Sequence, residues 1–252
     1  MKKINIFFTA LTAAVILSLP TAKAQEKIKK WEFNVFAGYN LGGTTPLPLP
    51  AEIRKIKSWS PGFTPTLAFH ATRWLNPEWG LTSGISIDIK GMIIRADVKY
   101  MYTYLQVGEG DQTGPFEGNF SGQNKTSVKN GYLTLPLLAT YRPFERWTFH
   151  AGGYIAFLKD KKFEGDASDG YIRVGGPTGD YINIEQATFD FSGEERNVDA
   201  GLIAAADWRF NERMAVKGQL SWGLVPIFPS DFKGIPYKMY NVYFLLGVAY
   251  RL

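Results

Sequence analysis

The alternation of apolar and polar residues constrains the fold of this chain more than any other feature. The last thirteen residues, 240–252, are apolar at every even position, whereas the odd positions include Asn241, Gly247 and Arg251. A period of two places these two sets on opposite faces of a β-strand. The stretch therefore predicts a strand with one uniformly apolar face.

Seven other stretches show the same alternation, and each has one face without a charged residue. They cover residues 31–41, 63–72, 79–90, 132–141, 147–157, 197–210 and 214–224. An Arg or Lys on the lipid face of a membrane barrel costs about 2 to 4 kcal/mol at the bilayer midplane. A soluble sandwich or lipocalin-like barrel would instead carry its charges outside and its apolar residues within. The charge-free faces therefore favour contact with lipid.

The connections between these stretches alternate between long and short. Short turns are expected at Leu75–Glu78, Arg142–Arg146 and Asn211–Arg213, and long loops at 42–60, from Tyr104 to Asn130, at 159–196 and at 226–238. Short periplasmic turns and long extracellular loops are typical of outer-membrane barrels. We predict an all-β fold, an eight-stranded antiparallel up-and-down transmembrane β-barrel, in which the first strand pairs with the last.

Two strands depart from the simple pattern. The third strand is expected to continue past Gly91, because Val98, Tyr100, Tyr102 and Tyr104 alternate again. In the middle of the fourth strand, Pro136 lacks the N–H group that a sheet ladder needs, which predicts a bulge or a local bend.

The N-terminus predicts export. Lys2 and Lys3 precede an apolar run to Leu19, and small residues follow at Ala22 and Ala24. These features predict a signal peptide over 1–24 and an outer-membrane β-barrel domain over 25–252, and the run is too short to favour an anchor helix.

Composition excludes several classes of protein. The chain contains no cysteine, so we expect neither a disulfide framework nor a lipid-bearing cysteine. Removal of 1–24 takes away Lys2, Lys3 and Lys23 and lowers the formal charge from +5 to 5 − 3 = +2. We therefore predict no nucleic-acid partner.

Several motifs together resemble a known family. They are the run Asn130–Leu138, Gly152-Gly153-Tyr154, the segment Asn197–Gly201 and the final strand. This set is similar to the PorT-like outer-membrane β-barrel family. The resemblance implies an outer-membrane barrel of a family that mostly lacks assigned activity. PorT itself is associated with protein secretion through the outer membrane, so an accessory role in such a system is one alternative.

The candidate polar residues face the predicted lumen. His70 and His150 are expected in its periplasmic half, with Asp207, Lys217 and Arg251 at a similar depth. An eight-stranded barrel is just wide enough for side chains to fill it, so we interpret this set as a buried network. A proton-linked or catalytic role is the alternative.

No enzymatic site is predicted. Lipid-modifying barrels need a Ser, a His and an acid near the outer leaflet, where Asp88 and Asp199 are expected but no histidine is. The acidic segment 159–196 favours a solvated surface that contacts lipopolysaccharide through divalent ions, with direct cation binding as the alternative. We predict no catalytic, cofactor-binding or metal site and no cofactor.

The sequence thus predicts a non-enzymatic barrel of structural or binding type, with a filled lumen and long extracellular loops. The alternatives are a narrow porin-like channel, a secretion accessory and, least favoured, a lipid A-modifying enzyme. The expected partners are outer-membrane lipid and lipopolysaccharide, the barrel assembly machinery that reads the final strand, and an envelope or secretion complex.

Overall fold

The computed structural model describes residues 30–107, 114–176 and 178–252, and the predicted signal peptide lies outside them. These residues form one antiparallel sheet of eleven strands and a short 3-10 helix. The elements are β1 (Trp31–Pro46), β2 (Ile53–Ser60), β3 (Pro65–Trp74), β4 (Trp79–Val107), β5 (Gly114–Phe144), β6 (Trp147–Asp160), β7 (Phe163–Arg173), β8 (Tyr181–Asp190), η1 (Ser192–Glu194), β9 (Val198–Arg209), β10 (Met214–Gly223) and β11 (Met239–Arg251). No helix in these residues is long and apolar enough to cross a membrane.

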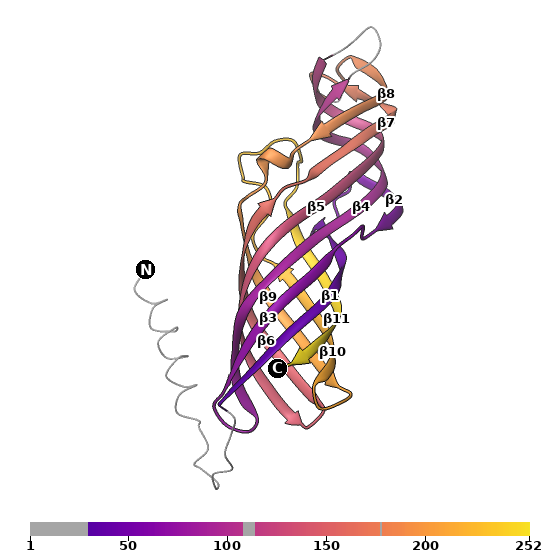
Figure 1. Ribbon diagram of the computed structural model, residues 1–252. Helices are drawn as coiled ribbons and strands as arrows, with labels where there is room; N and C mark the ends of the chain where they lie inside the picture. Colours follow the sequence, from indigo (N-terminus) through magenta and orange to yellow (C-terminus); the bar gives the residue numbers. More distant parts are fainter. Residues whose placement is uncertain (1–29, 108–113, 177) are drawn as a thin grey trace, which may run out of the picture.

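A closed barrel forms the lower part of the molecule (Figure 1). Hydrogen-bonded pairs run from β1 through β3, β4, β5, β6, β9, β10 and β11 and return to β1. The pairing of the first strand with the last is therefore confirmed. The predicted total of eight strands is wrong for the sheet, which also contains β2, β7 and β8.

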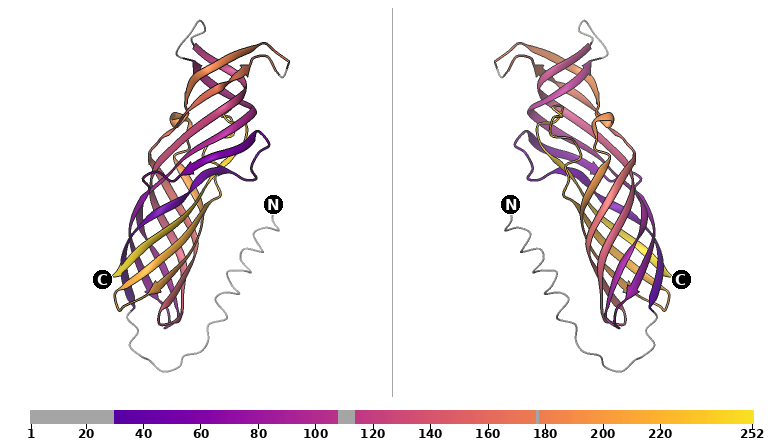
Figure 2. Two further views of the ribbon diagram at one scale, coloured as in Figure 1. Left: turned by 90° about the vertical axis from the view of Figure 1, so that its right-hand side faces the viewer. Right: turned by 90° about the vertical axis from the view of Figure 1, so that its left-hand side faces the viewer.

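The three additional strands build an extension above the barrel (Figure 2). β4 and β5, of 29 and 31 residues, continue into it, so most of the expected loop between Tyr104 and Asn130 is strand. β7 pairs with β5, β8 pairs with β7, and β8 returns to β4, which closes a second, smaller ring. Segments expected as loops at 42–60 and 159–196 thus contribute strands.

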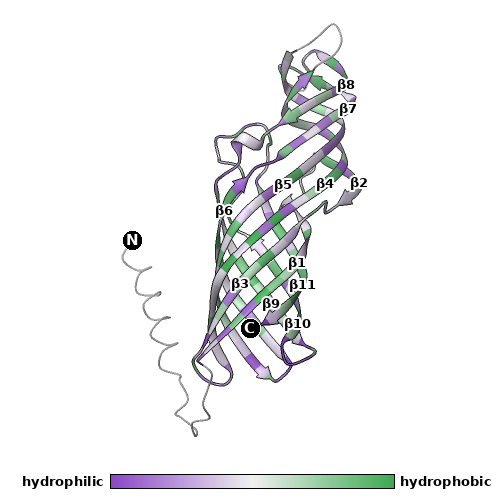
Figure 3. Ribbon diagram, in the orientation of Figure 1, coloured by the Kyte–Doolittle hydropathy of each residue, from purple (hydrophilic) through white to green (hydrophobic). Residues whose placement is uncertain are grey.

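The lipid-facing surface of the barrel has the predicted composition. In Figure 3, apolar and polar positions alternate along the barrel strands. Its exposed residues include Phe33, Leu67, Phe69, Leu81, Ile85, Ile87, Leu135, Leu137, Phe149, Ile155, Leu202, Leu220, Phe244, Leu246 and Val248. The polar set faces inward, where Lys90, Asp199 and Lys217 are buried. The inside-outside assignment is confirmed for these strands.

Of two local expectations, the continuation of the third strand past Gly91 is confirmed by β4, whereas the bulge at Pro136 is wrong. The pairs Leu135↔Ile155 and Leu137↔Gly153 keep one register across Pro136, so this strand has no bulge there. Ser83 instead donates a hydrogen bond from its hydroxyl to the Pro136 carbonyl oxygen, at 2.8 Å. In β4 the register shifts between Val98 and Met101, and this bulge leaves Val98 buried while Tyr100 is exposed.

The largest apolar cluster lies in the extension, and two smaller ones lie inside the barrel. Phe120, Phe163, Ile172 and Ile184 are almost completely buried in the extension, together with methionines of β4. Between the two smaller clusters the barrel lumen also holds threonines, tyrosines and ionisable side chains. Burial of apolar area stabilises the extension without help from lipid.

Candidate functional site

The predicted polar network exists in the periplasmic half of the lumen. Lys217 Nζ lies 2.7 Å from one oxygen of Asp207, and His150 Nε2 lies 3.2 Å from the other. Thr140 Oγ1 lies 2.9 Å from His150 Nδ1. These contacts confirm that three of the five predicted residues come together.

The other two predicted residues lie at the edge of this network. His70 is buried and packs edge-on against the ring of Phe36, with ring centres 4.9 Å apart. Arg251 lines a small space that also borders His150 and Asp207. Their depth was predicted, but neither makes an ion pair in the residues that the structure describes.

A second ion pair near the periplasmic turns escaped the sequence analysis. Both oxygens of Glu32 accept from Arg142 Nη2, at 2.9 and 3.0 Å, and the guanidinium lies 4.0 Å from the ring centre of Trp74. Arg142 was expected in a turn, and it reaches inward because β5 continues to Phe144. Nothing in the alternating pattern pointed to this contact.

A further network crosses the upper lumen. One oxygen of Asp199 accepts hydrogen bonds from Tyr154 at 2.9 Å and Asn241 at 3.0 Å, and it lies 3.7 Å from Lys90 Nζ. This ammonium also lies over the rings of Tyr132 and Tyr154, 5.0 Å from each centre. Asp199 is therefore held by buried partners in the upper lumen.

Asp88 is held in the same way. Thr66 and Ser86 each donate a hydroxyl hydrogen bond to it, at 2.9 Å. The free spaces beside these networks measure only about 10 and 30 Å³. Such spaces hold about one or two water molecules. The lumen is therefore filled by side chains over most of its length.

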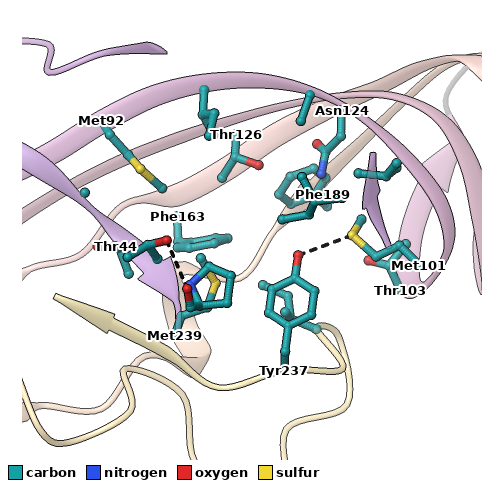
Figure 4. Close-up of a pocket in the computed structure, with 18 of the residues that line it drawn as sticks. Thr44, Met92, Met101, Thr103, Asn124, Thr126, Phe163, Phe189, Tyr237 and Met239 are labelled. Atoms are coloured by element: carbon teal, nitrogen blue, oxygen red, sulfur yellow. Dashed lines mark hydrogen bonds between the residues drawn. The ribbon is translucent and has the colours of Figure 1, made fainter. Parts of the chain in front are cut away.

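A much larger cavity, of about 230 Å³, lies in the extension above these networks. Figure 4 shows side chains from several strands and the loop before β11 around it. Most of the lining is apolar and includes Ile53, Met92, Ile94, Met101, Leu105, Phe120, Phe163, Phe189 and Ile235. This cavity could not be predicted from the sequence, because its walls come from segments far apart in the chain.

A few polar groups interrupt the apolar lining. The Oδ1 atom of Asn124 is buried and has no hydrogen-bond partner among the described residues. The hydroxyl of Tyr237 donates only to the sulfur of Met101, at 3.6 Å. Burial raises the pKa of Tyr237 to about 12, so the group stays a neutral hydroxyl. The cavity can thus hold an apolar molecule that carries one or two hydrogen-bonding groups.

The acidic segment 159–196 is only partly the solvated surface that we expected. Glu195, just before β9, is 4 % exposed and accepts a hydrogen bond from the side chain of Asn130. Within the described residues, no three His, Asp or Glu side chains are placed to hold a metal ion.

Glu195 should make stability depend on pH. Burial raises its pKa from 4.5 to about 7, so the folded state favours the protonated form. Its contribution is fully present below pH 4.5 and is lost as pH rises towards 7. We expect this residue to lower the free energy of unfolding by up to about 1.4 kcal/mol per pH unit in that window. Glu195→Gln should flatten the dependence in urea titrations at pH 5 to 8, and an unchanged slope would contradict the assignment.

A family model described as the outer membrane protein beta-barrel domain matches residues 23–229. The chain belongs to this family. Its place is accordingly the bacterial outer membrane, as the sequence predicted. None of the curated proteins compared with the chain matches it.

Solved barrels of this kind show only a coarse likeness to this family member. Ail of Yersinia pestis, in complex with the heparin analogue sucrose octasulfate, is 9% identical with a TM-score of 0.33, over 88% of this chain and 99% of that one. OprG of Pseudomonas aeruginosa is 11% identical with a TM-score of 0.37, over 88% and 95%. The translocator domain of NalP from Neisseria meningitidis is 14% identical with a TM-score of 0.25, over 99% and 96%.

Proposed function

We propose that this outer-membrane barrel is a non-enzymatic surface protein that binds a small hydrophobic ligand. The observation that carries the proposal is the apolar cavity of about 230 Å³ in the extension. Ligand sites are typically concave, mostly apolar and equipped with a few polar groups, as this cavity is. In this proposal the barrel anchors the extension in the membrane, and the extension holds the ligand.

The filled lumen argues against the porin-like alternative. A solute leaving the cavity towards the periplasm would meet the layer of Lys90, Tyr132, Tyr154 and Asp199, and below it the layer of His150, Asp207 and Lys217. Hydrogen bonds and ion pairs connect the side chains of both layers, across the lumen in the upper layer and between the neighbouring strands β6, β9 and β10 in the lower one. Opening them would leave charges buried without partners, which costs several kcal/mol.

Conductance measurements test the closed lumen. The protein in planar lipid bilayers is expected to give no ion conductance, because the free spaces in the lumen measure only about 10 and 30 Å³ and hold one or two waters each. Protection of the barrel from added protease serves as the control for insertion. Discrete conductance steps from protected protein would favour the channel.

The resemblance to the PorT-like family supports a different role, as an accessory of protein secretion. In that case the protein should co-purify with envelope machinery, and its deletion should impair export. Normal export in a deletion strain would remove that alternative. Unchanged lipid A after overexpression would likewise argue against a lipid-modifying enzyme.

A further inference from the structure

The mouth of the cavity lies between two strands that do not pair. β2 pairs with β4 and with no other strand in the described residues, so its second edge faces the upper end of β1. The indole nitrogen of Trp59 donates to the carbonyl oxygen of Gly42, at 3.1 Å, and connects the two strands. Gly43 and Thr44 of β1 and Ile56 of β2 line the cavity on the two sides of this break.

The exposed part of the cavity lining lies at the same place. Leu49, Ile56 and Trp59 line the cavity and are still 54%, 46% and 47% exposed. Two register shifts in β2 allow this arrangement, because they turn Ile53, Ile56 and Trp59, each three residues apart, towards one side. The opening is therefore lateral and apolar, and it lies beside the upper end of β1.

The strands beside the mouth carry a positive charge. Five basic and two acidic residues lie in segment 52–60, which includes β2, and in the facing segment 93–99 of β4. Their net charge is 5 − 2 = +3. The exposed basic residues are Arg54, Lys55, Lys57, Arg95 and Lys99. Of these, Lys57 is neutralised by Asp97, with 2.7 Å between the charged atoms. An apolar opening is thus bordered by exposed cations.

We propose that the cavity takes the hydrocarbon chain of an acidic amphiphile, which enters between β1 and β2 and leaves its headgroup against this basic surface. The inference rests on the proposed binding function and names the ligand class. An apolar cavity of about 150 Å³ is enough to hold benzene, so the volume here accommodates a longer apolar body. Each buried CH₂ group adds to the affinity, and the cations select for the acidic headgroup.

Asn124 makes the inference more specific. Its unpartnered Oδ1 atom can accept a hydrogen bond, and a plain alkyl chain would leave it unsatisfied. A chain with a hydroxyl group would supply the missing donor. We therefore expect a hydroxylated fatty acid to bind about tenfold more tightly than the unsubstituted acid of equal length.

The test measures displacement of the neutral fluorophore aminoanthracene from the full-length protein in nanodiscs without detergent, since detergents are themselves amphiphiles. Tetradecanoic acid should displace it more effectively than its methyl ester. The double variant Arg54→Gln with Lys55→Gln should weaken binding of the acid by about threefold for each charge removed. Binding of the ester should not change. Asn124→Leu should abolish the preference for the hydroxylated acid.

A matched pair of variants locates the entry. Ile56→Glu places a negative charge in the exposed lining and should abolish displacement by the acids, whereas Ser58→Glu adds the same charge on β2 outside the cavity lining and should weaken displacement much less. Because both positions are exposed, both variants should fold. Equal behaviour of the two would overturn the lateral entry.

Mass spectrometry of protein purified without added ligand distinguishes two sources of the hydrocarbon chain, a membrane lipid and a free fatty acid. A co-purified anionic lipid identifies a membrane lipid, and an empty cavity that takes up added acid identifies a free fatty acid. If aminoanthracene binds but no acidic amphiphile displaces it, the ligand class is wrong while the proposed function stands. If aminoanthracene does not bind, the ligand class and the proposed function are both wrong.

Discussion

Replacing Lys217 by Met is expected to destabilise the folded barrel by about 3 kcal/mol, because the change leaves a carboxylate buried without its cation. Lys217 is buried, and its ammonium lies 2.7 Å from Asp207. The pair spans neighbouring positions of β9 and β10. The measurement is the urea midpoint of protein refolded into lipid, with the wild type as reference.

The second half of this experiment removes both charges. The double variant Lys217→Met with Asp207→Leu should recover most of the lost stability, since a buried ion pair replaced by apolar residues of similar size is close to neutral. A double variant as unstable as the single one would show that packing at Lys217, and not the unpaired carboxylate, determines the loss.

A charge on the lipid face should impair assembly, at a cost in free energy comparable to that of Lys217→Met. Leu202 is 52% exposed on the outer side of β9. Leu202→Arg is expected to cost about 2 to 4 kcal/mol if the residue lies near the bilayer midplane. The fraction of protein that inserts into vesicles and becomes protease-resistant should fall strongly.

Gln219→Ala provides the control for that variant. Gln219 lies on the adjacent strand, faces the lumen, and has an Oε1 atom without a hydrogen-bond partner. Its truncation therefore removes little and should leave insertion unchanged. Equal losses for the two variants would mean that the inside and outside faces are assigned wrongly.

The barrel could be predicted from the sequence because the membrane imposes a simple pattern. Each strand must present apolar residues to lipid at every second position, so stretches such as 147–157 reveal both their conformation and their orientation. The same pattern predicted the depth of His150 and Asp207. It did not reveal Arg142 or Lys90, because positions near strand ends and turns carry no information about their partners across the lumen.

The extension could not be predicted in the same way, since no lipid dictates its pattern. The apolar residues of β2 recur at intervals of three, and only bulges bring them to one side of the strand. β7 and β8 carry acidic residues and glycine between Phe163, Ile172 and Ile184, which resembles loop composition. The cavity is still harder to predict, because its walls come from distant segments of the chain.

Because β4 is so long, two parts of the surface lie at different heights above the barrel. Beyond Lys90 the strand continues for 17 residues, or roughly 55 Å along its own axis. The turn between β7 and β8 lies near the far end of the molecule, whereas β2 lies lower, close to the barrel (Figure 1). A phage or an antibody arriving from the medium would meet that end of the molecule before it met β2. The proposed basic mouth beside β2 lies much nearer to the barrel strands, whose outer face is apolar, and is therefore better placed for a ligand that comes from the membrane.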